Sequence, residues 1–261
     1  MQKPTSTALI SSLPDSAFDI FSRMRERRPR VHCLTNTVAQ NFTANVLLAA
    51  GAVPSMTVAP EEIGEFVARA DALLINLGTL DRERRDAAEI ATEVAADEQR
   101  PWVLDPVFVD RSRSRADFAK SLVAKRPSAV RLNGAEFAAM AQADPSAAAL
   151  ARHALDQLCV IALTGAEDVV TDGPRMVRIE NGDPLMGKVT AMGCAGTAIV
   201  AACLAVEADA WLATFAALLV FAVAGECAAA RARGPGSLAV EIPDALASLD
   251  RATLLSRARV C

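Results

Sequence analysis

The sequence has no tyrosine and only two histidines among its 261 residues, so few side chains are available for acid–base chemistry or metal binding. Its six cysteines are scattered without CxxC spacing, and two histidines do not complete a convincing zinc cluster with them. The GxSxG, HExxH and complete P-loop motifs are also absent. These absences argue against serine-hydrolase, zinc-protease and Walker-type nucleotide sites.

The chain also lacks an excess of basic residues and any recognisable export signal. Its net charge is -4 and its pI is near 5.3, so we expect no nucleic acid partner. The first residues have neither the basic start nor the apolar core of a secretory signal, which favours a cytoplasmic protein with reduced thiols. The longest apolar run, Trp211 to Gly225, is short for a bilayer span, so we interpret it as a buried helix and expect no membrane partner.

What the chain does contain is apolar, with 52% hydrophobic and only 4% aromatic residues. A core of Ala, Val, Leu and Ile suits parallel strands covered by alanine-rich helices. Short apolar runs predict strands at 31–35, 52–58, 72–77, 102–106, 129–133 and 159–164. Helix-length segments lie between them, at 37–50, 60–70, 81–98, 113–126 and 134–142. This alternation predicts an α/β fold with a mainly parallel sheet and right-handed crossovers.

After residue 164 the pattern changes. Two short strand-like pieces, 168–173 and 175–181, predict an antiparallel hairpin at a sheet edge. The remainder, from Gly193 to about Arg257, is almost entirely helical in pattern. No linker divides the chain, so we expect one domain over residues 1–261, with residues 1–15 as a loosely ordered extension.

Ligands of parallel sheets gather at the carboxyl ends of the strands. Separately, a glycine-containing turn at 188–193 leads straight into a long apolar helix. Free amides and the positive end of a helix dipole suit a phosphoryl group, with Cys194 at the helix start. Close packing of small residues is the alternative explanation of this segment.

Two carboxylates also follow neighbouring predicted strands. Asp105 and Glu136 could hold a hydrated Mg²⁺ at one side of the sheet, or could simply cap a loop and a helix. Arg131 could bind a nucleotide phosphate or form a surface salt bridge. Asn36 is explained sufficiently as a helix N-cap, and His32, within a strand, is expected to be a satisfied core histidine.

Several of these segments together resemble the hydroxyethylthiazole kinase family, in order and spacing from about residue 16 to 255. They are VHCLTN (31–36), NFTAN (41–45), NLGTL (76–80), LDPV (104–107), RLNGAE (131–136), LTG (163–165), VTDG (170–173) and KVTAMGCA (188–195). The resemblance implies a ribokinase-like three-layer α/β/α fold without a separate lid domain. It also implies a homotrimer with sites between subunits, and Mg²⁺-assisted transfer of the γ-phosphoryl of ATP to 4-methyl-5-(2-hydroxyethyl)thiazole in thiamine salvage.

The resemblance also implies roles for individual residues of this chain. The catalytic positions are Gly193 and Cys194, and Cys194 faces the substrate hydroxyl. A helix N-terminus lowers a cysteine pKa, but a thiolate is a weaker base than an alkoxide, so we expect Cys194 mainly to orient the alcohol. The remaining matches are thiazole contacts at Asn36, Val38, Met56, Gly78 and Thr79, nucleotide contacts at Arg131, Asn133, Thr164 and Gly193, and Mg²⁺ ligands at Asp105 and Glu136.

Three positions depart from the family pattern, all on the nucleotide and metal side. Ala191 and Met192 stand where the family usually has Gly and Thr, and Phe108 begins a segment that is usually glycine-rich. If Ala191 must adopt a positive φ, its Cβ is unfavourable there. These departures leave open a slow enzyme, a different phosphoryl donor, or a catalytically silent thiazole-binding protein. A related kinase of another heterocyclic alcohol, such as hydroxymethylpyrimidine, is a separate alternative.

Overall fold

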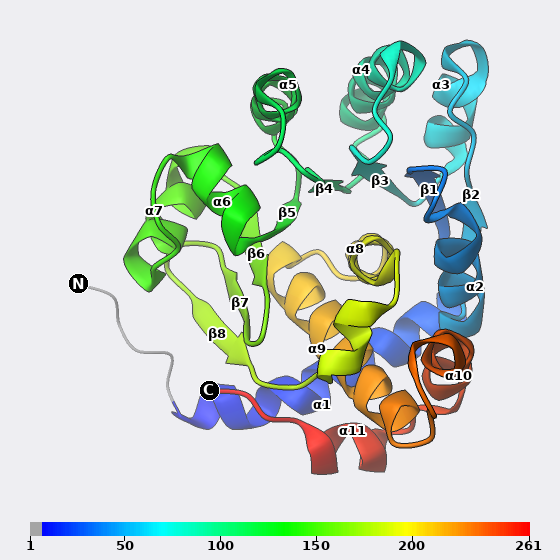
Figure 1. The fold of residues 1–261 in the computed structure, drawn as a ribbon, viewed down its shortest axis with the longest axis vertical. Helices are drawn as coiled ribbons and strands as arrows, with labels where there is room; N and C mark the ends of the chain where they lie inside the picture. Colours follow the sequence, from blue (N-terminus) through cyan, green and yellow to red (C-terminus); the bar gives the residue numbers. More distant parts are fainter. Residues whose placement is uncertain (1–6) are drawn as a thin grey trace.

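An eight-stranded sheet crosses the middle of the protein, and helices cover both of its faces (Figure 1). The computed structural model describes residues 7–261. The strand order is β2-β1-β3-β4-β5-β6-β7-β8; β1 to β6 run parallel, and β7 and β8 form an antiparallel hairpin at one edge. The strands are β1 Arg30–Leu34, β2 Val53–Ser55, β3 Ala72–Asn76, β4 Trp102–Asp105, β5 Ala129–Asn133, β6 Val160–Thr164, β7 Asp168–Thr171 and β8 Met176–Ile179.

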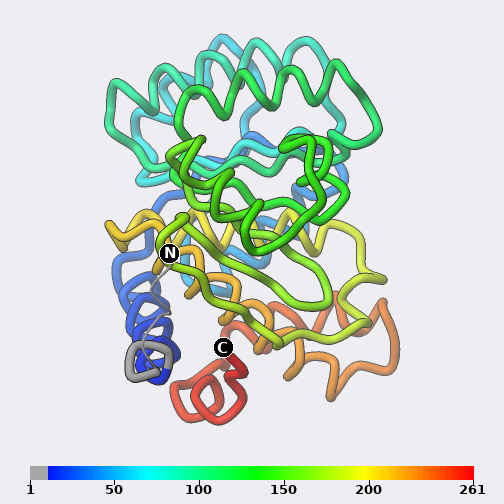
Figure 2. The backbone as a smooth tube through the Cα atoms, turned by 90° about the vertical axis from the view of Figure 1, so that its left-hand side faces the viewer, coloured from blue at the N-terminus to red at the C-terminus, as the bar shows by residue number. Residues whose placement is uncertain are grey.

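Two groups of helices form the outer layers, and Figure 2 shows them on opposite sides of the sheet. One layer contains α3 Pro60–Arg69, α4 Arg82–Asp97, α5 Arg113–Val123, α6 Gly134–Ala141 and α7 Ala147–Gln157. The other contains α1 Thr7–Arg27, α2 Gln40–Ala50, α8 Met192–Leu204, α9 Ala210–Ala229, α10 Pro235–Ser248 and α11 Arg251–Arg257. A short 3-10 helix, Pro184–Lys188, joins the hairpin to α8.

The central strands are mainly apolar because both faces of the sheet are buried. In β3, Ala72 and Leu74 pack against the layer of α8 and α9, whereas Leu73 and Ile75 pack against the layer of α3 and α4. Successive side chains of a strand point to opposite faces, so one run of residues contributes to two cores. The predicted α/β/α layering with a mainly parallel sheet and no separate lid is therefore confirmed for residues 7–261, as is the edge hairpin.

The long apolar helix α9 is a core helix. By length and composition alone it is the one helix among residues 7–261 that is apolar enough to cross a membrane, but 78% of its most apolar window is buried inside the protein. The interpretation of Trp211 to Gly225 as a buried helix is confirmed.

Two predicted segments differ from the structure. Residues 1–6 of the expected N-terminal extension lie outside the described residues, but residues 7–15 form the first turns of α1 and not a loose segment. Leu13, Ala17 and Ile20 of this helix are buried at helical spacing against the core. The strand predicted at 52–58 is also shorter, since β2 covers only Val53–Ser55 at one edge of the sheet.

Candidate active site

The carboxyl ends of the central strands meet the N-terminus of α8. Ala191 precedes this helix with φ 66°, in the left-handed region, so the turn does require the conformation that glycine adopts most easily. Gly193 lies directly against Arg131 of β5, since a Cβ added to Gly193 would be 2.5 Å from Arg131 Nη1. Because Gly193 has no side chain, the Arg131 guanidinium can lie against the start of α8.

Asn36 follows β1 and organises the loop before α2. Its Oδ1 accepts hydrogen bonds from the backbone N–H groups of Val38 and Ala39, at 3.1 and 3.0 Å. Asn36 therefore closes a turn ahead of α2, and the expectation that it is the N-cap of that helix is wrong, because the helix begins only at Gln40. Its Nδ2 points into the site, towards Asn76 Oδ1 at 2.9 Å and Cys194 Sγ at 3.4 Å.

Cys194 is held next to Asn36 and Asp105 in the first turn of α8. Burial, followed by the negative charge of Asp105, raises the pKa of its thiol to about 11. The expected lowering by the helix N-terminus is therefore outweighed. At neutral pH the thiol is protonated, which suits a group that orients an alcohol better than one that removes its proton.

Asp105 ends β4 and is only 1% exposed. Burial raises the pKa of its carboxyl to about 6, and the nearby Glu136 charge adds to this, while Arg131 and the Thr197 hydroxyl act in the opposite direction. Thr197 Oγ1 donates to Asp105 Oδ2 at 2.8 Å from one helical turn beyond Gly193. Asp105 thus lies among a guanidinium, a hydroxyl and a second carboxylate.

Glu136 has the structural role that the sequence left open. One oxygen accepts from the N–H of Asn133, in a capping box at the start of α6, and the other from the N–H of Phe108, both at 2.9 Å. Phe108 is exposed and has φ 59°, again a left-handed residue where the family pattern has a glycine-rich segment. Each carboxylate oxygen can accept a second partner, so the pair Asp105 and Glu136 also fits a magnesium ion held largely through water.

The four predicted nucleotide-side residues come together around one cavity of about 560 Å³. This size suits a small-molecule ligand. Sequence reasoning missed the rest of the wall, where Asp168 of the hairpin lies next to Arg131 and burial raises the pKa of its carboxyl to about 6. Residues lining the cavity include Arg131, Asn133, Thr164, Gly193, Asp168, Asn181, Gly182, Met186, Met192 and Phe221.

The predicted thiazole-side residues are brought together only in part. Gly78 packs against Asn36, with 2.7 Å between an added Cβ and Asn36 Cβ, and Thr79 Oγ1 accepts from the N–H of Thr37 at 3.3 Å. Val38 is 59% exposed on the same loop. Met56 follows β2 and is partly buried. It packs against the core on the α8 and α9 side of the sheet.

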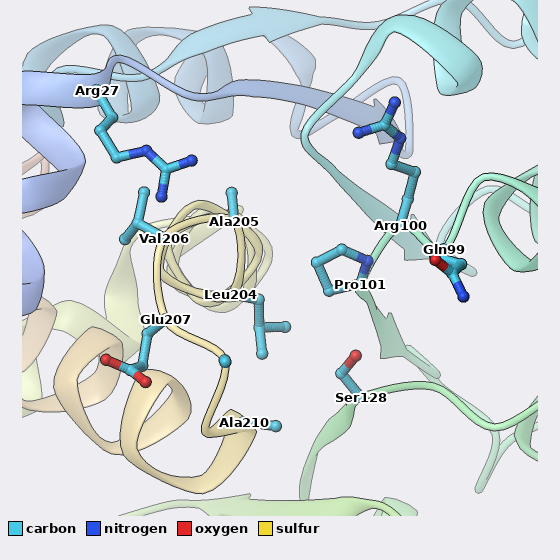
Figure 3. A pocket seen from close by; sticks show the side chains of 11 residues that line it. Arg27, Gln99, Arg100, Pro101, Ser128, Leu204, Ala205, Val206, Glu207 and Ala210 are labelled. Atoms are coloured by element: carbon cyan, nitrogen blue, oxygen red, sulfur yellow. The ribbon is translucent and has the colours of Figure 1, made fainter.

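A second cavity of about 570 Å³ lies at the opposite end of the sheet (Figure 3). Its wall includes Pro101 and Ser128, just before β4 and β5, and Leu204 at the end of α8. Arg27 and Arg100 lie on two sides of the cavity in Figure 3, and Arg100 Nη2 donates to the Ala68 carbonyl oxygen at 3.1 Å. None of the predicted site residues lines this cavity.

Comparison with known proteins places the chain in a family. The model of the hydroxyethylthiazole kinase family matches residues 21–252. The chain belongs to the hydroxyethylthiazole kinase family. A hydroxyethylthiazole kinase of Rhizobium etli strain CIAT 652 is 47% identical over 91% of this chain and 97% of its own. A probable hydroxyethylthiazole kinase of Agrobacterium fabrum is 44% identical over 94% of each chain.

Solved structures agree with this membership. The hydroxyethylthiazole kinase protein of Pyrococcus horikoshii OT3 has a TM-score of 0.89 and 35% identity, over 95% of this chain and 98% of that one. Pyridoxal kinase of Staphylococcus aureus in complex with pyridoxal has a TM-score of 0.62 at 14% identity, over 76% of this chain and 88% of its own, and shares the fold alone. The fold is thus ribokinase-like, as expected.

Proposed function

We propose that this chain transfers the γ-phosphoryl group of ATP to the hydroxyl group of 4-methyl-5-(2-hydroxyethyl)thiazole, as a kinase of thiamine salvage. Its family membership supports this activity. The observation that carries the proposal is the meeting of Asn36, Asp105 and Cys194 at the start of α8, directly beside the cavity that Arg131 lines. An alcohol-binding group and a phosphate-binding group are thereby within one site.

The nucleotide lies in the 560 Å³ cavity, with Arg131, Asn133 and Thr164 as its contacts. The guanidinium offers several fixed donors to phosphate oxygens. The amides around Gly193 and Cys194, at the positive end of α8, stabilise the charge of the transferring group. Such positioning accounts for most of catalysis when the transition state is loose.

The thiazole lies among Asn36, Val38, Met56, Gly78 and Thr79, with its hydroxyl towards the Cys194 thiol. Because that thiol is protonated at neutral pH, its role is to orient the alcohol. Asp105 and Glu136 hold Mg²⁺ on the phosphate side. When bound, this ion neutralises charge on the phosphate oxygens.

The assembly is a homotrimer of single-domain subunits in the cytoplasm, with the thiazole site between neighbouring subunits. The exposure of Val38 supports this arrangement, because a wall of the substrate site is open in the single chain. Leu48 of α2 and Val53 of β2 are further exposed apolar side chains of the same part of the fold.

Two other activities compete with this proposal: phosphorylation of a different heterocyclic alcohol such as hydroxymethylpyrimidine, and thiazole binding without transfer. The similar proteins of Rhizobium etli, Agrobacterium fabrum and Pyrococcus horikoshii are described as hydroxyethylthiazole kinases, which favours thiazole phosphorylation over both. The altered turn still forms, since α8 begins at Met192 even though Ala191 carries a Cβ in the left-handed region.

The test is formation of phosphorylated thiazole by purified protein with ATP and Mg²⁺, followed by mass spectrometry. Product is expected from the wild type, much less from Asp105→Ala, and an intermediate amount from Cys194→Ala. Thiazole binding without any product in the wild type would contradict kinase activity and favour the silent binding protein.

A further inference from the structure

The orientation of the Asn36 side chain is determined by its own loop. Two backbone N–H groups, those of Val38 and Ala39, point at one end of the side-chain amide. Because both are donors, this end must be the oxygen, Oδ1. The other end of the amide is then the nitrogen, and it donates towards Asn76 Oδ1 and Cys194 Sγ. The Asn36 nitrogen thereby requires an acceptor oxygen from Asn76.

Asn76, at the end of β3, is fixed in turn. Its Oδ1 accepts from Asn36 Nδ2 at 2.9 Å and from the N–H of Gly78 at 3.0 Å. Both bonds require the oxygen at that position, so the amide nitrogen occupies the opposite end of the side chain. Asn76 is 2% exposed, and its Nδ2 has no hydrogen-bond partner among residues 7–261.

This nitrogen lies beside Asp105 and Cys194. Asn76 is paired with Asp105 in the register of β3 and β4, so their side chains are neighbours on one face of the sheet. The Asn76 amide is close to both the Asp105 carboxyl and the Cys194 thiol, yet makes a full hydrogen bond to neither. A buried donor without a partner is unfavourable, so an acceptor brought by a ligand would satisfy it.

We propose that the Asn76 side-chain amide donates a hydrogen bond to the oxygen of the acceptor alcohol and thereby sets the position of that oxygen between Cys194 and Asp105. This inference rests on the proposed function and adds a substrate contact to it. An alcohol oxygen can accept from the amide while its own hydrogen is donated to the carboxylate or the thiol. The Asn36–Asn76 pair is then already oriented to bind the hydroxyl group of the substrate rather than its thiazole ring.

The test compares two ligands that differ only in the hydroxyl: 4-methyl-5-(2-hydroxyethyl)thiazole and 4-methyl-5-ethylthiazole. Their dissociation constants are measured by calorimetry with the wild type, Asn76→Asp and Asn76→Ala, all at pH 8. Asn76→Asp keeps an oxygen for Asn36 and Gly78 and removes the donor, whereas Asn76→Ala removes the whole amide. Melting temperatures show which variants are folded, and either folded variant decides the test.

The wild type is expected to prefer the alcohol by roughly tenfold, because the ethyl ligand leaves the buried amide unpaired. In both variants this preference is expected to fall at least about threefold, because the alcohol loses its donor but keeps an acceptor for its own hydrogen. An equal weakening of both ligands, with the preference retained, would mean that Asn76 is only structural. A wild type without hydroxyl preference would also overturn the proposal. Phosphorylation by the wild type is scored separately, so loss of the kinase assignment is distinguishable from either outcome.

Discussion

The hydrogen bond between Thr197 and Asp105 can be removed with little change of shape by the substitution Thr197→Val. Valine fills the volume of threonine but has no hydroxyl. In the native protein Thr197 Oγ1 is 2.8 Å from Asp105 Oδ2 and 3.0 Å from the carbonyl oxygen of Gly193, and both side chains are buried. The substitution leaves a buried carboxylate with one donor fewer.

A hydrogen bond to a charged group contributes about 1.5–3 kcal/mol. Because the Thr197 hydrogen is shared with the Gly193 carbonyl, the lower part of this range, about 1.5–2 kcal/mol, is the relevant one. If Asp105 acts as a carboxylate on the Mg²⁺ side, kcat/KM is expected to fall about 10- to 30-fold, since each 1.4 kcal/mol is a factor of ten. The Mg²⁺ concentration for half-maximal activity should rise as well.

The assay is ADP formation in the presence of hydroxyethylthiazole, with Mg²⁺ varied. Thr214→Val is the matched control, because Thr214 is also a buried helical threonine that donates to a carbonyl one turn earlier, that of Ala210. Thr197→Ser should retain most of the activity. If Thr197→Val kept kcat/KM within twofold of Thr214→Val, Asp105 would not depend on this hydroxyl and the reasoning would be refuted.

Three further substitutions test separate features. Ala191→Gly should raise the free energy of unfolding by about 0.5–1 kcal/mol in urea titrations, since relief of the left-handed Ala191 exceeds the added freedom of the unfolded chain; a decrease would contradict the strained turn. Gly193→Ala should raise the KM for ATP at least about tenfold at unchanged melting temperature, because the new Cβ would be 2.5 Å from Arg131 Nη1; an unchanged KM would remove Arg131 from the nucleotide site. Burial lowers the pKa of His32 from 6.5 to about 4, so between these values only the unfolded chain binds the proton. The free energy of unfolding should therefore fall by up to about 3 kcal/mol as the pH falls from 6.5 to 4, and His32→Gln should flatten this slope; an equal slope in the variant would assign the effect to other groups.

The strands, and the edge of the sheet at which the site lies, could be predicted from the sequence because they depend on local composition. Each central strand, from β3 to β6, is a short, mainly apolar run that ends on a polar residue, as in ALLIN, which ends at Asn76, or WVLD, which ends at Asp105. Parallel strands bring their carboxyl ends to one edge, so Asp105 and Glu136 are predicted at one side of the sheet, and the family resemblance adds Arg131 and Cys194 to the same site. His32 was expected as a satisfied core residue, and its ring contacts Ser55 Oγ at 2.8 Å and the Thr57 carbonyl at 3.2 Å.

Other features depend on contacts between distant segments, which periodicity does not reveal. Helix α1 contains Pro14, a residue that usually marks a helix boundary, and only the packing of Leu13 and Ile20 on the core shows that the helix extends beyond it. Asp168 joins the cavity wall because the hairpin places it beside Arg131. The motif NLGTL contains Asn76, but the direction of its amide follows from Asn36, forty residues away.

The central claim is thiazole phosphorylation, and competition between two alcohols tests it most directly. The protein is incubated with Mg²⁺, ATP and equal concentrations of hydroxyethylthiazole and hydroxymethylpyrimidine, and both phosphorylated products are quantified by mass spectrometry. Their initial ratio equals the ratio of the two kcat/KM values. The account predicts that thiazole phosphate predominates by at least about tenfold. Predominance of the pyrimidine phosphate, or the absence of both products, would contradict it.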